Sequence, residues 1–260
     1  MRINILQHRK LKDYDEKLKN YLMKENITID DNDFFILLGH IETIDDIEIF
    51  KSYKFEKIGK IAILHDSFDY IYDILEVVDR VIVHHRFQKE ILLSKYINST
   101  YIIHLDYPIE YKRFINPPSD IKIFLPEECN DEEIIDYIKS NYEIVNDPQE
   151  ASIFVLAYKD ESFGNYHTFY ELFSYQRPFI LPKFPQFIEF SILKSTVDIL
   201  YSNKEQIKKI VEKFKDKWFY RYHLSIVRAH AISNSFKRFS KQLMNVMKNV
   251  IPEDFVSLYI

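Results

Sequence analysis

The sequence predicts an α/β fold with two parallel-sheet domains facing a cleft and a C-terminal helical segment that crosses back. Short, branched apolar runs alternate with amphipathic stretches along the 260 residues, as expected of parallel strands covered by helices. The segment Asp106–Asp120 carries three prolines and no periodicity, and so resembles a linker between two such series. We therefore expect domains at 1–110 and 111–214, with helices at 215–260 packing back on the first domain.

The first domain contains five short apolar runs with the character of buried strands. They are Arg2–Leu6, Phe34–Gly39, Lys60–Leu64, Arg80–His84 and Thr100–His104. Helical stretches lie between them. Beyond Arg86–Glu90, for example, the apolar residues Ile91 and Leu92 recur at helical spacing.

The second domain repeats the alternation. Strands are expected at Ile121–Leu125, Ser152–Tyr158, Arg177–Leu181 and Val197–Ser202, and helices at 131–141, 166–175 and 203–214. Asn203 is a good N-cap for the last helix, with Glu205 in its first turn. Ligands of such sheets bind beyond the carboxyl ends of the strands, and a cleft between two domains is the default site.

The C-terminal segment combines an apolar stripe with basic charge. The stripe is Ile232, Phe236, Phe239, Leu243, Val246 and Val250, and Ser233 or Asn234 would cap its helix. Eight Lys or Arg residues between 215 and 248 stand against one acid, Asp216. This pattern fits a helix packed across the domains under the stems of Lys and Arg. It also fits a helix lying on a membrane surface.

Composition and missing motifs exclude several classes of protein. A net charge of -5 gives no overall attraction to nucleic acid, so none is expected as a partner. The single cysteine, Cys129, allows no internal disulfide and no cysteine metal cluster. No apolar run reaches the roughly 18 residues of a membrane span, and the first residues lack an apolar signal block. We expect a cytoplasmic protein, at most peripheral at a membrane.

With three glycines, the chain contains no dinucleotide or P-loop fingerprint.

The stretch "ESFGNYHTFYELFSYQRPF", Glu161–Phe179, holds one of these glycines. Gly164 permits a tight turn with close backbone approach. A helix starting near Tyr166 would offer N–H groups to a phosphate, and Glu171, about one turn further on, would accept hydrogen bonds from sugar hydroxyls. A plain strand–turn–helix with a capping carboxylate explains the same residues, and the residues alone leave both interpretations open.

This block resembles the C-terminal signature of retaining family 4 glycosyltransferases, whose GT-B fold has two Rossmann-like domains. Glu161–Gly164 fills the family's Glu-x-Phe-Gly turn, and "ELFSYQRPFI" (Glu171–Ile180) fills the following helix and strand. "KIAILHDSF", "VDRVIVHHRFQKEILLSKYINSTYIIHLDYPIEYKRF" and "HAISNSFKRFSKQLMNVM" are similar to other family segments in the same order, so the resemblance covers most of Lys60–Met247.

The resemblance implies transfer of a sugar from a nucleotide-sugar to an acceptor hydroxyl with retention of configuration. The acceptor would be a glycan, lipid or protein, and neither a metal nor another cofactor is expected. His65 and Glu161 would be the catalytic residues, in contact with the donor sugar or acceptor. The nucleotide-sugar would be held by Lys159, Phe163, Gly164, Asn165, Thr168 and Glu171. An interior histidine in a structural role is the alternative for His65.

Several residues depart from the family pattern. Glu161 and Glu171 are ten apart rather than eight, and Gln176 replaces a glycine. Where the family has an Arg and a Lys-Gly pair to neutralise the diphosphate, this chain has the acidic "IKIFLPEECNDEEII". The substitute cations would be Lys159, Arg177, Lys183 or Arg86, with Lys159 the best placed. Two alternatives therefore stay open: a non-catalytic GT-B-like binding protein, and a basic-helix module that binds anionic lipid or nucleic acid.

Overall fold

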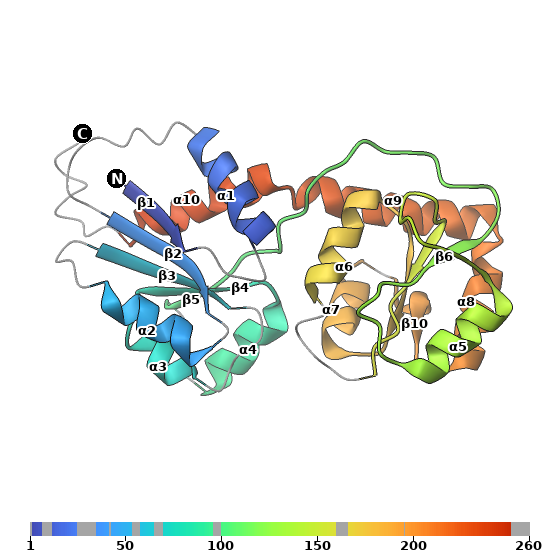
Figure 1. The fold of residues 1–260 in the computed structure, drawn as a ribbon, viewed down its shortest axis with the longest axis horizontal. Coiled ribbons are helices and arrows are strands. Elements are labelled where there is room, and N and C mark those ends of the chain that lie inside the picture. The colour runs from blue at the N-terminus through green and yellow to red at the C-terminus, as the bar shows by residue number, and fades with distance from the viewer. Residues whose placement is uncertain are drawn as a thin grey trace. The chain divides into compact units, whose positions relative to one another are not determined.

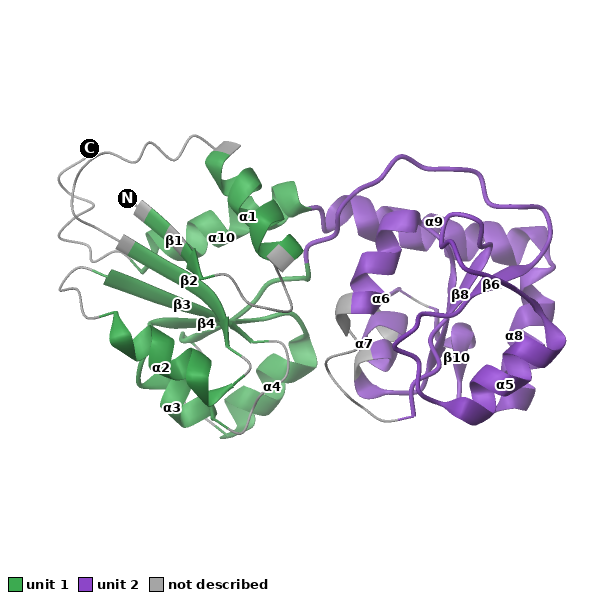
Figure 2. Ribbon diagram, in the orientation of Figure 1, with its two compact units in different colours: residues 1–107, 236–260 green, residues 108–235 purple. Residues whose placement is uncertain are grey.

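A computed structural model describes residues 2–6, 12–24, 35–41, 43–53, 58–64, 70–95, 100–159, 166–194 and 196–250 (Figure 1). The chain forms two compact units, which we call unit 1 and unit 2 (Figure 2). Unit 1 comprises residues 1–107 and 236–260, and unit 2 comprises residues 108–235. The chain thus leaves unit 1 after its last strand and returns to it for the final helix.

Unit 1 contains a five-stranded parallel sheet in the order β1-β2-β3-β4-β5. The strands are β1 (Arg2–Leu6), β2 (Phe35–Ile41), β3 (Ile58–Leu64), β4 (Arg80–Val83) and β5 (Ile102–His104). The helices are α1 (Lys12–Lys24), α2 (Ile44–Ser52), α3 (Ile71–Leu75), α4 (Arg86–Lys95) and α10 (Phe236–Lys248). In Figure 1, α2, α3 and α4 cover one face of this sheet and α1 and α10 the other. The apolar strands are therefore buried from both sides.

One glycine of unit 1 is required by close packing. A Cβ atom on Gly39, in β2, would lie 3.0 Å from Cβ of Leu6 and 3.1 Å from the ring of Phe50. Both distances are tighter than ordinary van der Waals contact, so this position lets β1 and α2 pack directly on β2. The glycine therefore serves the core of the unit.

Unit 2 contains a second five-stranded parallel sheet, in the order β10-β9-β8-β6-β7. The strands are β6 (Lys122–Phe124), β7 (Glu143–Val145), β8 (Ile153–Val155), β9 (Phe179–Pro182) and β10 (Leu200–Tyr201). The helices are α5 (Glu132–Asn141), α6 (Tyr166–Leu172), α7 (Pro185–Lys194), α8 (Lys204–Phe214) and α9 (Lys217–Ser233), with short 3-10 turns at η2 (Phe173–Tyr175) and η3 (Val197–Ile199). The chain moves outward from β6 to β7 and then returns to the other side of β6 for β8. This reversal is a topological switch point, where ligands of open α/β sheets bind.

The predicted α/β class with two parallel sheets is confirmed. Each expected strand is found in part or in full, and Asn203 caps α8 by accepting a hydrogen bond from the N–H of Gln206. Strand β7, a three-residue edge strand, is not among the predicted strands. Half of the strand expected at Val197–Ser202 is the 3-10 turn at Val197–Ile199, and only Leu200–Tyr201 pairs with β9.

The expected linker at Asp106–Asp120 is bound along unit 2 from Pro108 onward. The N–H of Ile109 donates to the carbonyl of Asn234 at 2.7 Å, and Nε2 of Gln176 donates to the carbonyl of Lys112 at 2.7 Å. Nη1 of Arg177 donates to the carbonyl of Ile115 at 2.9 Å. The bonded partners lie more than sixty residues apart in sequence, and for this reason local composition could not reveal the attachment.

The C-terminal segment forms two helices rather than one stripe. Helix α9 belongs to unit 2 and α10 to unit 1. The expectation was that all helices in 215–260 pack back on the first domain. Asn234 ends α9, and its Nδ2 lies 3.0 Å from Nδ1 of His230. Phe236, Phe239 and Leu243 are buried, but Ile232 is 57% exposed and lies outside their stripe.

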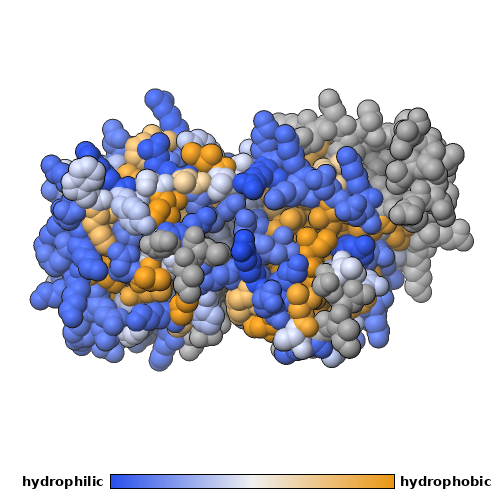
Figure 3. Space-filling view, turned by 180° about the vertical axis from the view of Figure 1, so that it is seen from behind, coloured by the Kyte–Doolittle hydropathy of each residue, from blue (hydrophilic) through white to orange (hydrophobic). Residues whose placement is uncertain are grey.

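Among the described residues, no helix combines the length and the apolar character needed to cross a bilayer. On the face drawn in Figure 3, hydrophobic side chains form separate patches between hydrophilic ones.

Candidate functional site

The switch point of unit 2 is built by two loops that are hydrogen-bonded to each other. The loop after β6 and the loop after β8 follow neighbouring parallel strands and therefore meet at the carboxyl edge of the sheet. The carbonyl of Ala157 accepts from the N–H groups of Asn130 (2.9 Å) and Asp131 (3.0 Å). Oδ1 of Asn130 in turn accepts from the N–H of Lys159 at 2.8 Å. These bonds fix the backbone on both sides of the switch point.

Two further contacts explain why the β6 loop takes this path. Asp131 is the N-cap of α5, because its side chain accepts from the N–H of Ile134. Sγ of Cys129 accepts from the N–H of Ala157 at 3.1 Å. Burial raises the pKa of Cys129 to about 12, so the thiol is neutral at physiological pH and acts as a packing and hydrogen-bonding group rather than a nucleophile.

Two tyrosines support the end of β8 from within unit 2. The hydroxyl of Tyr201 donates to the carbonyl of Leu156 at 2.8 Å. Burial raises the pKa of Tyr158, and the nearby side chain of Thr168 partly opposes this rise. Thr168, on α6, therefore lies beside the residue that precedes Lys159. The structure brings these two predicted binding residues to the same end of one strand.

The predicted site residues have three outcomes. Lys159 is exposed with its backbone anchored by Asn130. Thr168 is half-buried and Glu171 is exposed, and since they are three residues apart on α6 they lie on the same side of that helix. The remaining predicted residues, His65, Glu161, Phe163, Gly164 and Asn165, lie outside the described residues.

The prediction that Arg177 could neutralise a diphosphate is wrong. It is 1% exposed and precedes β9, at the amino edge of the sheet. Its guanidinium donates to four backbone carbonyls, those of Ala151, Ile115, Tyr175 and Gln149. Burial lowers its pKa from the ordinary value. These bonds tie the segment before β6 and the loop before β8 to the segment before β9, so the role of Arg177 is structural.

The other charges near the carboxyl edge are mixed in sign. Lys183 follows β9 directly and is exposed. Glu127 and Glu128 are exposed in the turn after β6. Arg86 is in unit 1, at the start of α4. Within the described part of unit 2, the basic side chains that follow strands at this edge are Lys159, Lys183 and Lys204. Nζ of Lys204 lies 3.2 Å from Oε1 of Glu133, so this lysine already has an acidic partner.

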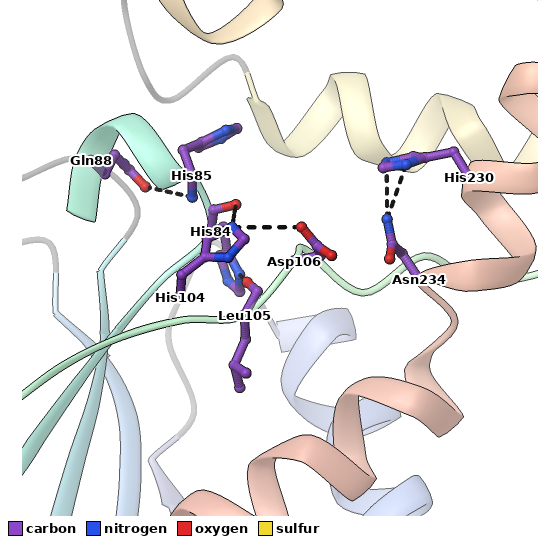
Figure 4. A network of polar contacts seen from close by, with 8 residues as sticks. All are labelled: His84, His85, Gln88, His104, Leu105, Asp106, His230 and Asn234. Carbon is purple, nitrogen blue, oxygen red and sulfur yellow. Dashed lines mark hydrogen bonds and ion pairs between the residues drawn. The ribbon is translucent and has the colours of Figure 1, made fainter. Parts of the chain in front are cut away.

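The carboxyl edge of the unit 1 sheet gathers histidines (Figure 4). Nδ1 of His84 donates to the carbonyl of Leu105 at 2.8 Å, and Nε2 of His104 donates to the carbonyl of His84 at 3.2 Å. Nε2 of His104 also lies 3.5 Å from Oδ1 of Asp106. The N–H of His85 donates to Oε1 of Gln88 at the start of α4. His65 follows β3 in sequence, but it lies outside the described residues.

Burial keeps two of these histidines, His84 and His85, neutral. It lowers the pKa of both His84 and His85 to about 3. His84 also packs against Tyr107 and Phe239, at ring-centroid distances of 4.8 and 5.9 Å. The side chain of His104 is 17% exposed and has a carboxylate nearby. Among the described histidines at this edge, His104 is therefore the one best placed to meet a ligand.

Sequence reasoning missed Asn130, Cys129 and His104. The acidic charge of "PEECNDEE" dominates this stretch of sequence and does not indicate the hydrogen-bonding roles of Asn130 and Cys129. The usable signal was an Asn immediately before an Asp that caps a helix, directly after a strand. His104 ends a predicted strand, which is the position where α/β proteins place ligand-contacting side chains.

The chain is similar in fold to solved glycosyltransferases. A mutant of S. aureus TarM, solved with fondaparinux, alpha-GlcNAc-glycerol and UDP, aligns with a TM-score of 0.59 and 12% identity over 90% of this chain and 59% of TarM. A second TarM structure aligns with a TM-score of 0.58 and 14% identity, over 90% of this chain and 58% of TarM. The apo form of the lipopolysaccharide outer core galactosyltransferase WaaB aligns with a TM-score of 0.53 and 13% identity, over 94% of this chain and 82% of WaaB. No family model and no curated protein matches the sequence.

These comparisons establish the architecture. The two parallel five-stranded sheets with their helices form a GT-B-type fold, and its structural neighbours are glycosyltransferases. The chain spans about three fifths of the length of TarM. At these identities the likeness is one of fold, which by itself assigns neither an activity nor substrates to this chain.

Proposed function

We propose that this protein is a glycosyltransferase that moves a sugar from a nucleotide-sugar to an acceptor hydroxyl. The observation that carries the proposal is the fold likeness to glycosyltransferases across 90% or more of this chain. The ordered switch point in unit 2 supports it, because nucleotides bind at such points in α/β sheets.

The donor is assigned to the carboxyl edge of unit 2. Lys159 and Lys183 would supply positive charge to the diphosphate, and stabilisation of developing charge commonly contributes more to catalysis than any other single effect. Thr168 and Glu171 would bind hydroxyl or phosphate oxygens from α6. By its family resemblance, Glu171 would hold the ribose, and the turn at Phe163–Asn165 would cradle the diphosphate.

The acceptor is assigned to unit 1. By resemblance, His65 would contact the donor sugar or the acceptor, and Glu161 would lie near the reacting carbon. The bond between the anomeric carbon and the diphosphate oxygen breaks, and the acceptor hydroxyl oxygen bonds to the same face of the sugar while its proton passes to the departing diphosphate. Retention of configuration and independence from metal ions belong to this proposal and come from the family resemblance.

Titration calorimetry with UDP, GDP, ADP and CDP tests nucleotide binding, and UDP is the first choice because one TarM complex contains it. We expect Lys159→Ala to weaken binding by about tenfold, the loss of about 1.4 kcal/mol from one charged contact. Glu171→Ala should also weaken it. Lys208→Ala is the matched control, because Lys208 is an exposed lysine that lines a separate groove with Tyr137 and Tyr142. If the wild type binds no nucleoside diphosphate, the proposal fails.

A non-catalytic binding protein with the same fold is the second candidate. The observation in its favour is the exposed pair Glu127 and Glu128 in the turn after β6, where the resembled family has basic residues. Such a protein would bind nucleotide or glycan without turnover. Release of sugar from a nucleotide-sugar above background, abolished by Glu161→Gln, would exclude it.

A further inference from the structure

The outer face of helix α9 combines large exposed side chains with basic ones. Trp218 is 79% exposed, Tyr222 47% and Ile232 57%. At about 100° per residue, positions 218, 221, 222, 225, 229 and 232 fall within an arc of about 100°. His223, Val227 and Ala231, on the opposite side, are buried in unit 2. Helix α9 is therefore anchored by one face and presents the other to solvent. We call residues 218, 221, 222, 225, 229 and 232 the outer face.

The charge along this helix has one sign. Lys217, Arg221 and Arg228 lie on or beside the outer face, and residues 217–250 contain no Asp or Glu. The capping carboxylate of Asp216 is occupied by the N–H groups of Trp218 and Phe219. A basic face that also exposes Trp and Tyr is complementary to the headgroup region of an anionic bilayer, where aromatic rings and cations are both stabilised.

The segment 111–115 of unit 2 runs alongside α9 and continues this surface. The guanidinium of Arg228 lies 4.1 Å from the ring centroid of Phe114, and Ile109 is hydrogen-bonded to Asn234 at the end of α9. Tyr111 is 48% exposed and Ile115 49%. Arg113, between them, is exposed as well. The basic and apolar surface therefore extends beyond a single helix.

We propose that the outer face of α9, together with segment 111–115, binds the surface of an anionic lipid membrane. The charged residues attract the anionic headgroups, and Trp218, Tyr222 and Ile232 enter the interface. Each Lys or Arg near such a surface raises the partition coefficient about fivefold. The surface lies on unit 2 and does not involve the carboxyl-edge residues, so this binding is separate from the donor site.

A membrane explains these residues better than a nucleic acid does. Phosphate binding alone requires basic side chains and gains nothing from an exposed isoleucine. Stacking on bases would use Trp218 and Tyr222 but would leave Ile232 in water. An interface that is apolar on one side and charged on the other accommodates all three.

Trp218 is the only tryptophan in the chain, so its fluorescence reports directly on this surface. Wild-type protein is mixed with vesicles of phosphatidylcholine alone or with added phosphatidylglycerol, at low and high salt. We expect a blue shift of emission, protection from acrylamide and co-sedimentation, all with the anionic vesicles and all weaker at high salt. Arg221→Gln should lower the partition coefficient about fivefold, the equivalent of about 1 kcal/mol.

The variants are compared with matched controls. Tyr222→Ala and Ile232→Ser should reduce co-sedimentation, whereas Tyr72→Ala, which truncates a 63% exposed tyrosine on α3, should not. Lys208→Gln on α8 controls for loss of one charge. Absence of any blue shift with anionic vesicles at low salt overturns the proposal. So does binding to a DNA or RNA duplex without vesicle binding. Nucleotide affinity measured on the same variants keeps this outcome distinct from failure of the transferase proposal.

Discussion

The N–H of Lys159 donates a hydrogen bond to Oδ1 of Asn130 at 2.8 Å, and this bond joins the loops after β6 and β8. The two strands are neighbours in the sheet although they lie about thirty residues apart in the chain. A side-chain amide thus sets the backbone position of the lysine assigned to the diphosphate.

Replacing Asn130 by Ala removes this acceptor. We expect a loss of about 1 kcal/mol in stability, the typical worth of one hydrogen bond, together with weaker nucleotide binding because the Lys159 loop is released. Asn130→Asp keeps an acceptor oxygen and should retain the stability better. Thermal unfolding and calorimetry compare the two. Equal behaviour of both variants would show that the bond does not position the loop.

Replacing Arg177 by Met should destabilise unit 2 severely. The change removes the donor from four backbone carbonyls around a buried side chain, and each buried acceptor left unsatisfied costs about 1–3 kcal/mol. Arg177→Lys keeps the charge but lacks the fork geometry, so an intermediate loss is expected. Urea unfolding midpoints measure both, with Lys208→Ala as the control. An Arg177→Met midpoint equal to that control would refute the structural role.

Gln176 has the left-handed backbone conformation, with φ 57° and ψ 52°. This is the position where the resembled family has glycine. Gln176→Ala should lose the hydrogen bond to the Lys112 carbonyl and keep the strain, which costs about 1–2 kcal/mol for a residue with a Cβ. Gln176→Gly relieves the strain, so it should be more stable than the alanine variant by about 1 kcal/mol. The order of their melting temperatures tests this, and the reverse order would contradict it.

Acidification should destabilise the protein through buried histidines. Burial lowers the pKa of His84, His85 and His230 to about 3 from an ordinary value of 6.5. Between these values the unfolded chain binds more protons than the folded one, so stability is complete above pH 6.5 and falls as the pH drops. Each histidine contributes up to about 1.4 kcal/mol per pH unit in this window.

Urea unfolding at several pH values between 7.5 and 5 measures how steeply the free energy of unfolding changes with pH. His230→Leu should make the free energy of unfolding less dependent on pH, by the contribution of one histidine. The leucine is tolerated because the His230 ring packs against Phe173 and Phe190 in an apolar site. An unfolding midpoint that does not change with pH across this range would be inconsistent with neutral buried histidines.

The strands were predictable because their signal is local. Short branched runs such as Lys60–Leu64 and Arg80–Val83 are largely buried, and the pattern needs no partner to be recognised. The N-cap at Asn203 is equally local. Strand β7 was missed because an edge strand of three residues, Glu143–Val145, has mixed polarity and gains its structure only by pairing with β6.

The positions of Lys159 after β8 and of Thr168 on α6 could be predicted from sequence, and their binding roles stay predictions. Asn130 and Arg177 did not follow from sequence, because the role of each depends on partners about thirty or sixty residues away. An arginine before a strand has the same appearance in sequence whether it meets a ligand or four carbonyls.

The sequence by itself determined the class of fold, the parallel strands and the basic character of the C-terminal helices, because hydrophobic spacing and charge are properties of neighbouring residues. The tertiary structure alone decided which side of β6 received β8, which arginine was buried, and where the C-terminal stripe divided. Phe236 packs inside unit 1 while Ile232, four residues earlier, remains exposed on unit 2. Burial of a helix face depends on what the rest of the chain brings against it, and that contact is made only on folding.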